Sequence, residues 1–209
     1  MEMQDLINQS LEKLQLFDPE SVVEDFADNN PLPAEVGLRD VRNKTGSGYY
    51  CWLPGLIELL QPKQIVELGG AMGVADIMIL RTLSEDDHLY SVTLAENGLE
   101  FCYIKKNYPN FIPVVGDDLD LDNWPKDLDW DQVDLIFFDS EHSEDQLTKE
   151  LDLYFPLLKK GTILLFDDIH LNPGMDNVWR SLKCEKYDLT SSLHWSGFGL
   201  AKKDVDTWR

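Results

Sequence analysis

Three aspartates stand at the ends of apolar runs that we expect to be strands. Asp139 ends the run 133–139, and Asp167 and Asp168 follow the run 162–166. If these runs are neighbouring parallel strands about 4.8 Å apart, their carboxyl ends meet at one edge of the sheet. Clustered carboxylates repel one another unless a cation compensates, and oxygen ligands suit Mg²⁺, Ca²⁺ or Mn²⁺. The pattern predicts a divalent metal site; the alternative is that Asp139 contacts only a small-molecule cofactor while Asp167 and Asp168 cap a helix.

Two histidines near these acids are candidates for proton transfer, because imidazole titrates near neutral pH. His142 lies three residues after Asp139, and His170 lies two residues after Asp168. We favour His142 as the base, with metal binding or a surface position as the other roles for either histidine. Aromatic residues at 49, 50 and 195 could wall a binding pocket, although ordinary packing explains such residues equally well.

A glycine-rich segment, Glu67-Leu68-Gly69-Gly70-Ala71-Met72-Gly73, follows an expected strand and opens an expected helix. Glycines at this position let the backbone approach a ligand closely. The dinucleotide fingerprint would need a further glycine where Leu68 stands, so a pyrophosphate-binding NAD site is disfavoured. A tight turn without a ligand is the alternative.

The rest of the pattern supplies a sheet to hold these residues. Short apolar runs alternate with helical patterns, which is typical of a doubly wound, mostly parallel sheet with helices between its strands. We expect strands at the following ranges: 64–68, 89–94, 111–115, 133–139, 162–167, 187–189 and 197–202, the last two forming an antiparallel edge pair. We divide the chain into a helical cap or lid, residues 1–62, and a core, residues 63–209.

The composition of the chain limits the classes of molecule that it is expected to bind. The 209 residues carry 18 basic and 39 acidic side chains, a formal net charge of −21, without a basic patch, so nucleic acid is an unfavourable partner. Three widely spaced cysteines form no zinc motif, and the sequence contains neither a signal peptide nor an apolar run long enough to span a membrane. We expect a cytoplasmic protein without a membrane partner, in which the segment before Pro62 serves as a lid or as a homodimer contact.

The segment Glu-x-Gly-x-x-x-Gly at residues 67–73 resembles motif I of the class I S-adenosylmethionine (SAM)-dependent methyltransferases. The later segments 89–92, 114–118 and 134–139 resemble the second, third and fourth strands of that family, and the likeness extends from about residue 64 to 202. The resemblance implies a Rossmann-like seven-stranded sheet and SAM as the cofactor.

The resemblance also implies roles for individual residues. The glycine loop packs on the methionine part of SAM, an acid after the second strand binds the ribose, and an acid after the third strand reads the adenine amine. Thr93 stands where the ribose-binding acid is usual, so Glu96 takes that role only if the strand end bulges. The residues expected to bind the cofactor are Glu67, Gly69, Gly70, Ala71, Gly73, Thr93, Glu96, Asp117, Asp118 and Asp139.

The Asp-x-x-His-Ser segment at residues 139–143 and the acids after the fifth strand are similar to the metal-dependent branch of small-molecule O-methyltransferases that modify sugars and antibiotics. This likeness implies a metal held by Asp139, Asp167 and Asp168, with Asp139 and His142 as catalytic residues and a small-molecule hydroxyl as the acceptor. Two alternatives stay open: a metal-independent methyltransferase, and a non-catalytic SAM-binding scaffold suggested by the missing acid at Thr93.

Overall fold

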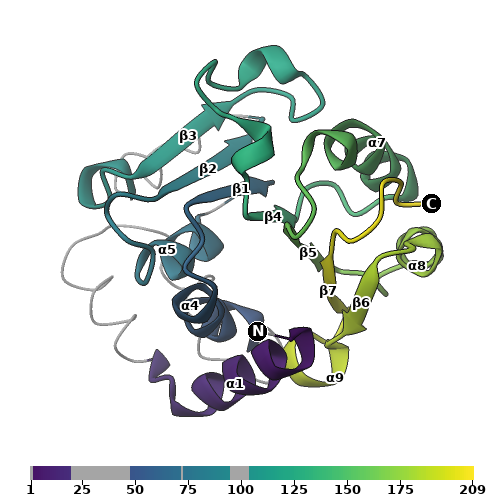
Figure 1. Cartoon of the computed structure of the whole chain (residues 1–209), viewed down its shortest axis with the longest axis horizontal. Coiled ribbons are helices and arrows are strands. Elements are labelled where there is room, and N and C mark those ends of the chain that lie inside the picture. Colours follow the sequence, from purple (N-terminus) through teal and green to yellow (C-terminus); the bar gives the residue numbers. More distant parts are fainter. Residues whose placement is uncertain (1, 20–47, 72, 95–103) are drawn as a thin grey trace.

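The computed structural model describes residues 2–19, 48–71, 73–94 and 104–209. Seven strands within these residues form one sheet with the order β3-β2-β1-β4-β5-β7-β6 (Figure 1). The strands are β1 (Gln64–Leu68), β2 (His88–Thr93), β3 (Phe111–Val115), β4 (Leu135–Phe138), β5 (Ile163–Asp167), β6 (Glu185–Asp188) and β7 (Phe198–Lys202). The first five are parallel, whereas β7 runs antiparallel to both β5 and β6. The predicted mostly parallel sheet with an antiparallel carboxyl-terminal edge is confirmed.

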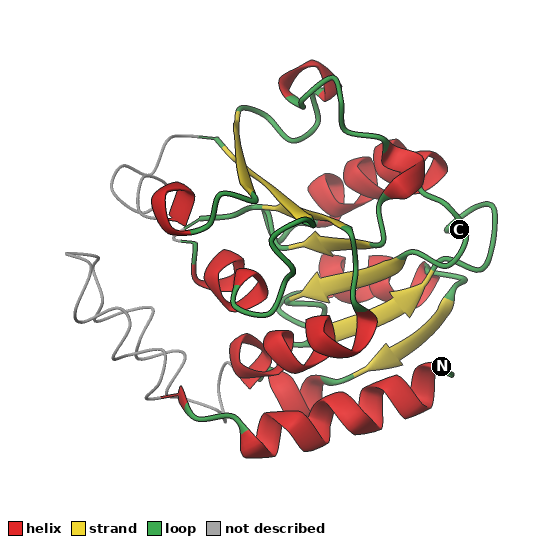
Figure 2. Cartoon of the chain, turned by 60° about the vertical axis from the view of Figure 1, so that its left-hand side comes forward, coloured by secondary structure: helices red, strands yellow, loops and turns green. Residues whose placement is uncertain are grey.

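Helices cover both faces of the sheet (Figure 2). One face carries α1 (Met3–Leu16), α4 (Gly48–Leu60), α5 (Val74–Leu80) and the short α9 (Thr190–Leu193), and the other carries α7 (Glu144–Tyr154) and α8 (Pro173–Ser181). Three 3-10 turns complete the connections: Leu121–Asn123, Trp130–Gln132 and Phe155–Leu157. No helix among the described residues is long and apolar enough to cross a membrane.

The sheet has an apolar core on each face, because the side chains of each strand point alternately to one face and the other. Ile65 and Phe137 pack with the helices of the first face, whereas their neighbours Val66 and Phe138 pack with the second. Successive side chains of a strand point to opposite faces, so a strand with helices on both sides is apolar on both faces, as β4 is throughout and β1 is apart from Gln64 and Glu67. This double burial fixes the register and therefore the positions of the strand ends.

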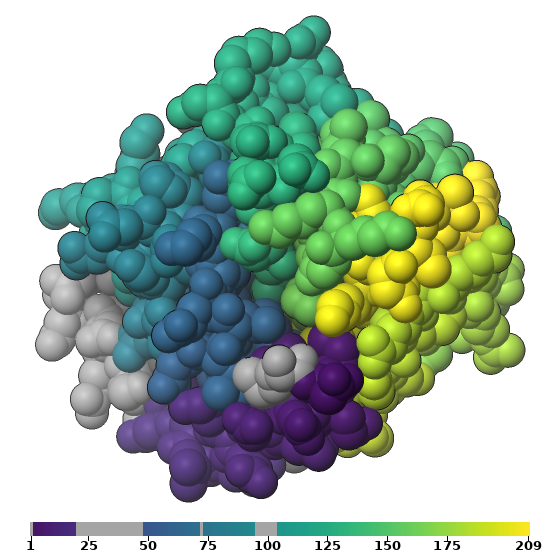
Figure 3. Space-filling view, viewed as in Figure 1, coloured from purple at the N-terminus to yellow at the C-terminus, as the bar shows by residue number. Residues whose placement is uncertain are grey.

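The first helices are part of the first core. Trp52 of α4 is fully buried, and its indole N–H donates to Ser10 Oγ of α1 at 2.8 Å. Figure 3 shows α1, in purple, lying along the blue residues, which begin at residue 48. The division into a cap at 1–62 and a core at 63–209 stays a prediction, and residues 20–47 lie outside the described residues.

Five of the seven strands differ from their predicted bounds by one or two residues, and local contacts explain two of these differences. β4 begins at Leu135 rather than at residue 133, because the 3-10 turn Trp130–Gln132, capped by Asp129, ends at Val133. β6 ends at Asp188 because the Asp188 carboxylate accepts the backbone N–H of Thr190 and turns the chain into α9.

Candidate active site

The register of the sheet places the glycine loop beside the end of β4. Leu68 of β1 pairs with Phe138 of β4, so Gly69 and Asp139 leave the sheet side by side. Gly69 has φ of 97°, and a Cβ built on it would lie 2.0 Å from the Asp139 carbonyl oxygen. Glycine is required here both by the left-handed conformation and by the close approach of two backbones.

A pocket of about 470 Å³ opens between this loop and the carboxyl ends of β2, β3 and β4. Its lining residues are Gly69, Ala71, Val92, Thr93, Leu94, Gly116, Asp117, Asp118, Leu119, Asp139, Ser140, Glu141 and Gln146. Six of the ten residues predicted to bind the cofactor are among them. Glu67, Gly70 and Gly73 do not line the pocket, and Glu96 lies outside the described residues.

One wall of the pocket contains a buried polar network that the sequence analysis did not predict. The Gln146 amide donates to Asp118 at 2.9 Å and to Glu150 at 3.1 Å, and Ser140 Oγ also donates to Glu150. Burial, followed by the neighbouring Asp118, raises the pKa of Glu150 well above its ordinary value. The acid that follows β3 is therefore held in place from α7. The sequence contains a signal for this network, because Glu150 interrupts the apolar face of α7.

A second buried acid pair lies next to the glycine loop. Glu67 is 2% exposed and Asp76 is fully buried, and a Cβ on Gly70 would lie 2.1 Å from Ser91 Oγ and 3.3 Å from Asp76 Oδ2. Burial and the charge of Asp76 raise the pKa of Glu67, and burial raises the pKa of Asp76 to about 6. Asp76 is thus packed inside the domain, in the first turn of α5.

The three predicted metal-binding aspartates converge, together with two histidines, in what we call the acid–histidine cluster: Asp139, His142, Asp167, Asp168 and His194. β4 pairs Phe138 with Phe166 of β5, so Asp139 and Asp167 emerge from adjacent strands. His142 Nε2 lies 3.3 Å from Asp139 Oδ1, and its Nδ1 lies 3.5 Å from Asp168 Oδ2. His194 Nδ1 lies 3.2 Å from Asp167 Oδ1 and 3.4 Å from Asp168 Oδ1.

The charges within the cluster are strongly coupled. Burial, followed by repulsion from Asp167, raises the pKa of Asp139 well above its ordinary value. Burial disfavours the charge of His194, but the neighbouring carboxylates of Asp167 and Asp168 raise its pKa to about 10. The pKa of Asp168 is lowered despite burial, because His194 and Ser196 hydrogen-bond to it. The histidines therefore supply part of the positive charge that the carboxylates need.

The carboxylates of Asp139, Asp167 and Asp168 offer oxygen atoms of the kind that bind divalent cations. One ligand atom from each of Asp139, His142 and Asp167 lies within 4.8 Å of the other two, and the same holds for Asp167, Asp168 and His194. Asp167 is 4% exposed; His194 Nδ1 lies 3.2 Å from its Oδ1, but no donor in the described part of the chain meets hydrogen-bond geometry with that oxygen. Buried carboxylate oxygens are normally paired, so this oxygen is available to a ligand.

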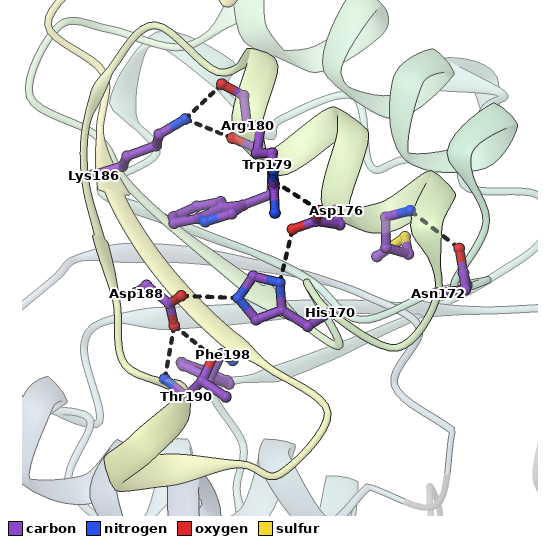
Figure 4. Close-up of polar contacts among 10 residues, drawn as sticks. His170, Asn172, Asp176, Trp179, Arg180, Lys186, Asp188, Thr190 and Phe198 are labelled. Carbon is purple, nitrogen blue, oxygen red and sulfur yellow. Dashed lines mark hydrogen bonds and ion pairs between the residues drawn. The ribbon is translucent and has the colours of Figure 1, made fainter.

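The other proton-transfer candidate, His170, lies outside the cluster. Its Nδ1 is 3.0 Å from Asp176 of α8 and its Nε2 is 2.8 Å from Asp188 of β6, so both ring nitrogens face other carboxylates (Figure 4). This arrangement connects α8 to the edge of the sheet. His142, in contrast, faces Asp139, a residue that lines the pocket.

The predicted aromatic residues differ in their surroundings. Tyr49 is buried and stacks on Phe198 with ring centroids 5.0 Å apart, while its edge meets the His194 ring at 5.2 Å. Tyr50 is partly buried, and burial followed by the Asp139 charge raises its pKa. Trp195 is 71% exposed. Tyr49 therefore packs against the cluster, whereas Trp195 faces solvent.

Comparisons with known proteins agree with this geometry. A family described as a methyltransferase domain matches residues 66–169, the part of the chain that runs from β1 past the end of β5. No curated protein sequence matches the chain.

Several solved structures share the fold. A methyltransferase from Geobacter sulfurreducens is 16% identical with a TM-score of 0.61, covering 88% of this chain and 97% of its own. The O-methyltransferase TomG from Streptomyces achromogenes, involved in tomaymycin synthesis and solved with SAM, is 20% identical with a TM-score of 0.57, covering 76% and 80%. An O-methyltransferase from Bacillus cereus, solved with SAH, is 15% identical with a TM-score of 0.57, covering 91% and 100%. The family match identifies residues 66–169 as a methyltransferase domain, and the described chain shares its fold with these methyltransferases of known structure.

Proposed function

We propose that this chain transfers the methyl group of SAM to a hydroxyl group of a small molecule, with a divalent cation held by Asp139, Asp167 and Asp168. The observation that carries the proposal is the double role of Asp139. Asp139 lines the pocket beside the glycine loop, and its carboxylate Oδ1 lies 3.3 Å from His142 Nε2 in the acid–histidine cluster. A cofactor pocket and a proton-accepting, cation-binding group therefore share one strand end.

SAM supplies the methyl group in this reaction, and the pocket supports its binding. Gly69 and Ala71 of the glycine loop, expected beside the methionine part, line the pocket, as do Asp117 and Asp118 after β3, the acids expected to bind the adenine. The pocket includes Thr93, whose hydroxyl is the polar group available for the ribose among the described residues that end β2. TomG and the B. cereus protein, which were solved with SAM and SAH, support this choice of cofactor.

The cluster provides the chemistry on the acceptor side. A bound divalent cation would lower the pKa of the acceptor hydroxyl and fix its oxygen near the methyl group. His142 then accepts the hydroxyl proton, and the carboxylates of Asp139 and Asp168 hold its ring and stabilise the imidazolium. TomG, an O-methyltransferase of tomaymycin synthesis, supports a small hydroxylated acceptor such as a catechol, phenol or sugar.

A metal-independent methyltransferase is the second candidate, and one observation favours it. His142 and His194 already lie within 3.2–3.5 Å of the three carboxylates, so the chain itself contributes counter-charges. In that case the acids orient the two histidines and the cofactor, and proton transfer to His142 proceeds without a cation.

Calorimetric titration of SAM, followed by a methyl-transfer assay on a panel of hydroxylated acceptors, tests both candidates. We expect SAM to bind, and we expect transfer that stops on exhaustive chelation and returns with Mg²⁺ or Mn²⁺. His142→Gln should lower kcat by about 10²- to 10⁴-fold, the usual contribution of a general base. His88→Gln, at the start of β2 and away from the cluster, serves as the matched control.

The outcomes separate the candidates. Transfer that survives chelation would establish the metal-independent enzyme. SAM binding without transfer to any acceptor would favour a non-catalytic scaffold, and the absence of SAM binding would overturn the proposal as a whole.

A further inference from the structure

His194 occupies a position beside the acids that the sequence analysis did not anticipate. It follows α9 in the turn that leads into β7, far along the chain from the glycine loop. One atom, Nδ1, lies 3.2 Å from Asp167 Oδ1, 3.4 Å from Asp168 Oδ1 and 2.9 Å from Ser196 Oγ. A single ring nitrogen therefore faces two of the proposed metal-binding carboxylates.

The turn that carries His194 is fixed to the end of β5. The backbone N–H of His170 donates to the Ser196 carbonyl at 2.8 Å, and Ser196 Oγ donates to Asp168. Gly197 has φ of 112°, and a Cβ there would lie 2.6 Å from the His170 nitrogen. Tyr49 packs edge-on against the His194 ring from α4. The imidazole is held from several sides, as a ligand must be.

The unsatisfied Asp167 Oδ1 is the independent sign of a ligand at this point. It belongs to a 96% buried residue, because Asp167 is 4% exposed, and no donor among the described residues meets hydrogen-bond geometry with it. Asp167, Asp168 and His194 can each place one ligand atom within 4.8 Å of the others. The donor set around this oxygen thus contains both carboxylate oxygens and an imidazole nitrogen.

We infer that Nδ1 of His194 is a nitrogen ligand of the divalent cation, and that the site prefers a first-row transition ion such as Fe²⁺ or Ni²⁺ to Mg²⁺ or Ca²⁺, with Mn²⁺ serving as the spectroscopic probe. This inference rests on the proposed function, because it concerns the cation held by Asp139, Asp167 and Asp168. Imidazole suits transition metals, whereas an all-carboxylate site suits Mg²⁺ and Ca²⁺. The nitrogen ligand would also join the β6–β7 segment to the active site.

Pulsed electron paramagnetic resonance of the full chain with MnCl₂ alone tests the ligand directly, because imidazole nitrogen modulates the Mn²⁺ echo signal. We expect nitrogen modulation in the wild type, in His142→Gln and in His88→Gln, and its loss in His194→Gln. We also expect His194→Gln to weaken Mn²⁺ binding at least tenfold in calorimetry, since even outer-shell changes cost about 10- to 100-fold. Mg²⁺ binding should weaken far less.

The wild-type spectrum decides the inference even if a variant folds poorly, and circular dichroism checks each variant. Mn²⁺ binding without nitrogen modulation would overturn the inference and leave the metal part of the proposed function standing. Modulation lost in His142→Gln but retained in His194→Gln would overturn it as well, by assigning the nitrogen to the other histidine. No Mn²⁺ binding would overturn both the inference and the proposed metal site.

Discussion

Asp76 provides a prediction in which removing a charge stabilises the protein. Its side chain is fully buried in α5, where Glu67 and Ser91 lie beside its carboxylate. The nearby Glu67 is also acidic, so the site holds two carboxyl groups with no cationic partner shown. Burial raises the pKa of Asp76 from 3.8 to about 6. Ionising this residue in the folded state therefore opposes folding.

The size and sign of the effect follow from linkage. Between pH 3.8 and about 6 the folded chain binds the Asp76 proton more tightly than the unfolded chain does. The free energy of unfolding therefore falls as pH rises through this window, by about 3 kcal/mol in total, because one pKa unit corresponds to about 1.4 kcal/mol. Asp76→Asn removes this loss. We expect it to be more stable than the wild type at pH 7.5 by up to about 3 kcal/mol, and the difference to vanish towards pH 4.

Urea unfolding of the wild type and Asp76→Asn between pH 4.5 and 7.5 measures this difference. Asp86→Asn is the matched control, because it removes one negative charge from an exposed position. The control corrects for the general repulsion of a chain with net charge −21. An Asp76→Asn variant that is less stable than the wild type at pH 7.5, or that shows a difference independent of pH, would refute the reasoning.

Two further changes test the fold around the site. Gly69→Ala should prevent SAM binding and lower stability far more than Gly161→Ala. Both glycines have φ near 100°, but only the new Cβ at Gly69 would meet the backbone, 2.0 Å from the Asp139 carbonyl oxygen. Calorimetry measures SAM binding, and urea unfolding measures stability. Equal effects of the two substitutions would contradict the steric argument. Ser10→Ala leaves the buried Trp52 indole N–H without its acceptor and should cost about 1–3 kcal/mol of unfolding free energy, and an unchanged urea midpoint would contradict this.

The sequence predicted the sheet well because its strands are buried on both faces. The run 64–68 is apolar apart from Gln64 and Glu67 and is bounded by lysine and glycine, and the observed β1 has the same bounds. The position of Asp139 beside Asp167 was also predictable, since acids at the ends of adjacent parallel strands share one edge. The edge strand β6 was less predictable, because its side chains are only partly buried or exposed and carry no alternation signal.

His194 was not predictable from local sequence. It reaches Asp167 only because β7 returns antiparallel beside β5, which pairs Asp167 with Phe198. No spacing along the chain records that pairing. The burial of Glu67 was not predictable for a related reason: its motif suggests cofactor contact, while its 2% exposure is set by the packing of β1 between β2 and β4. Motifs indicate which residues approach a ligand, but burial depends on elements that are distant in sequence.

The Glu67–Asp76 pair and the acid–histidine cluster differ in what compensates their negative charge, and Asp139 interacts electrostatically with both. Glu67 and Asp76 have no basic partner among the described residues, and burial raises the pKa of both, which favours a shared proton over double ionisation. The acid–histidine cluster has His142 and His194 as counter-charges. The charge of Asp139 is one of the causes that raise the pKa of Glu67. A cation that neutralised Asp139 would therefore make Glu67 easier to ionise, so substitutions in the two groups should not be additive in their effect on stability.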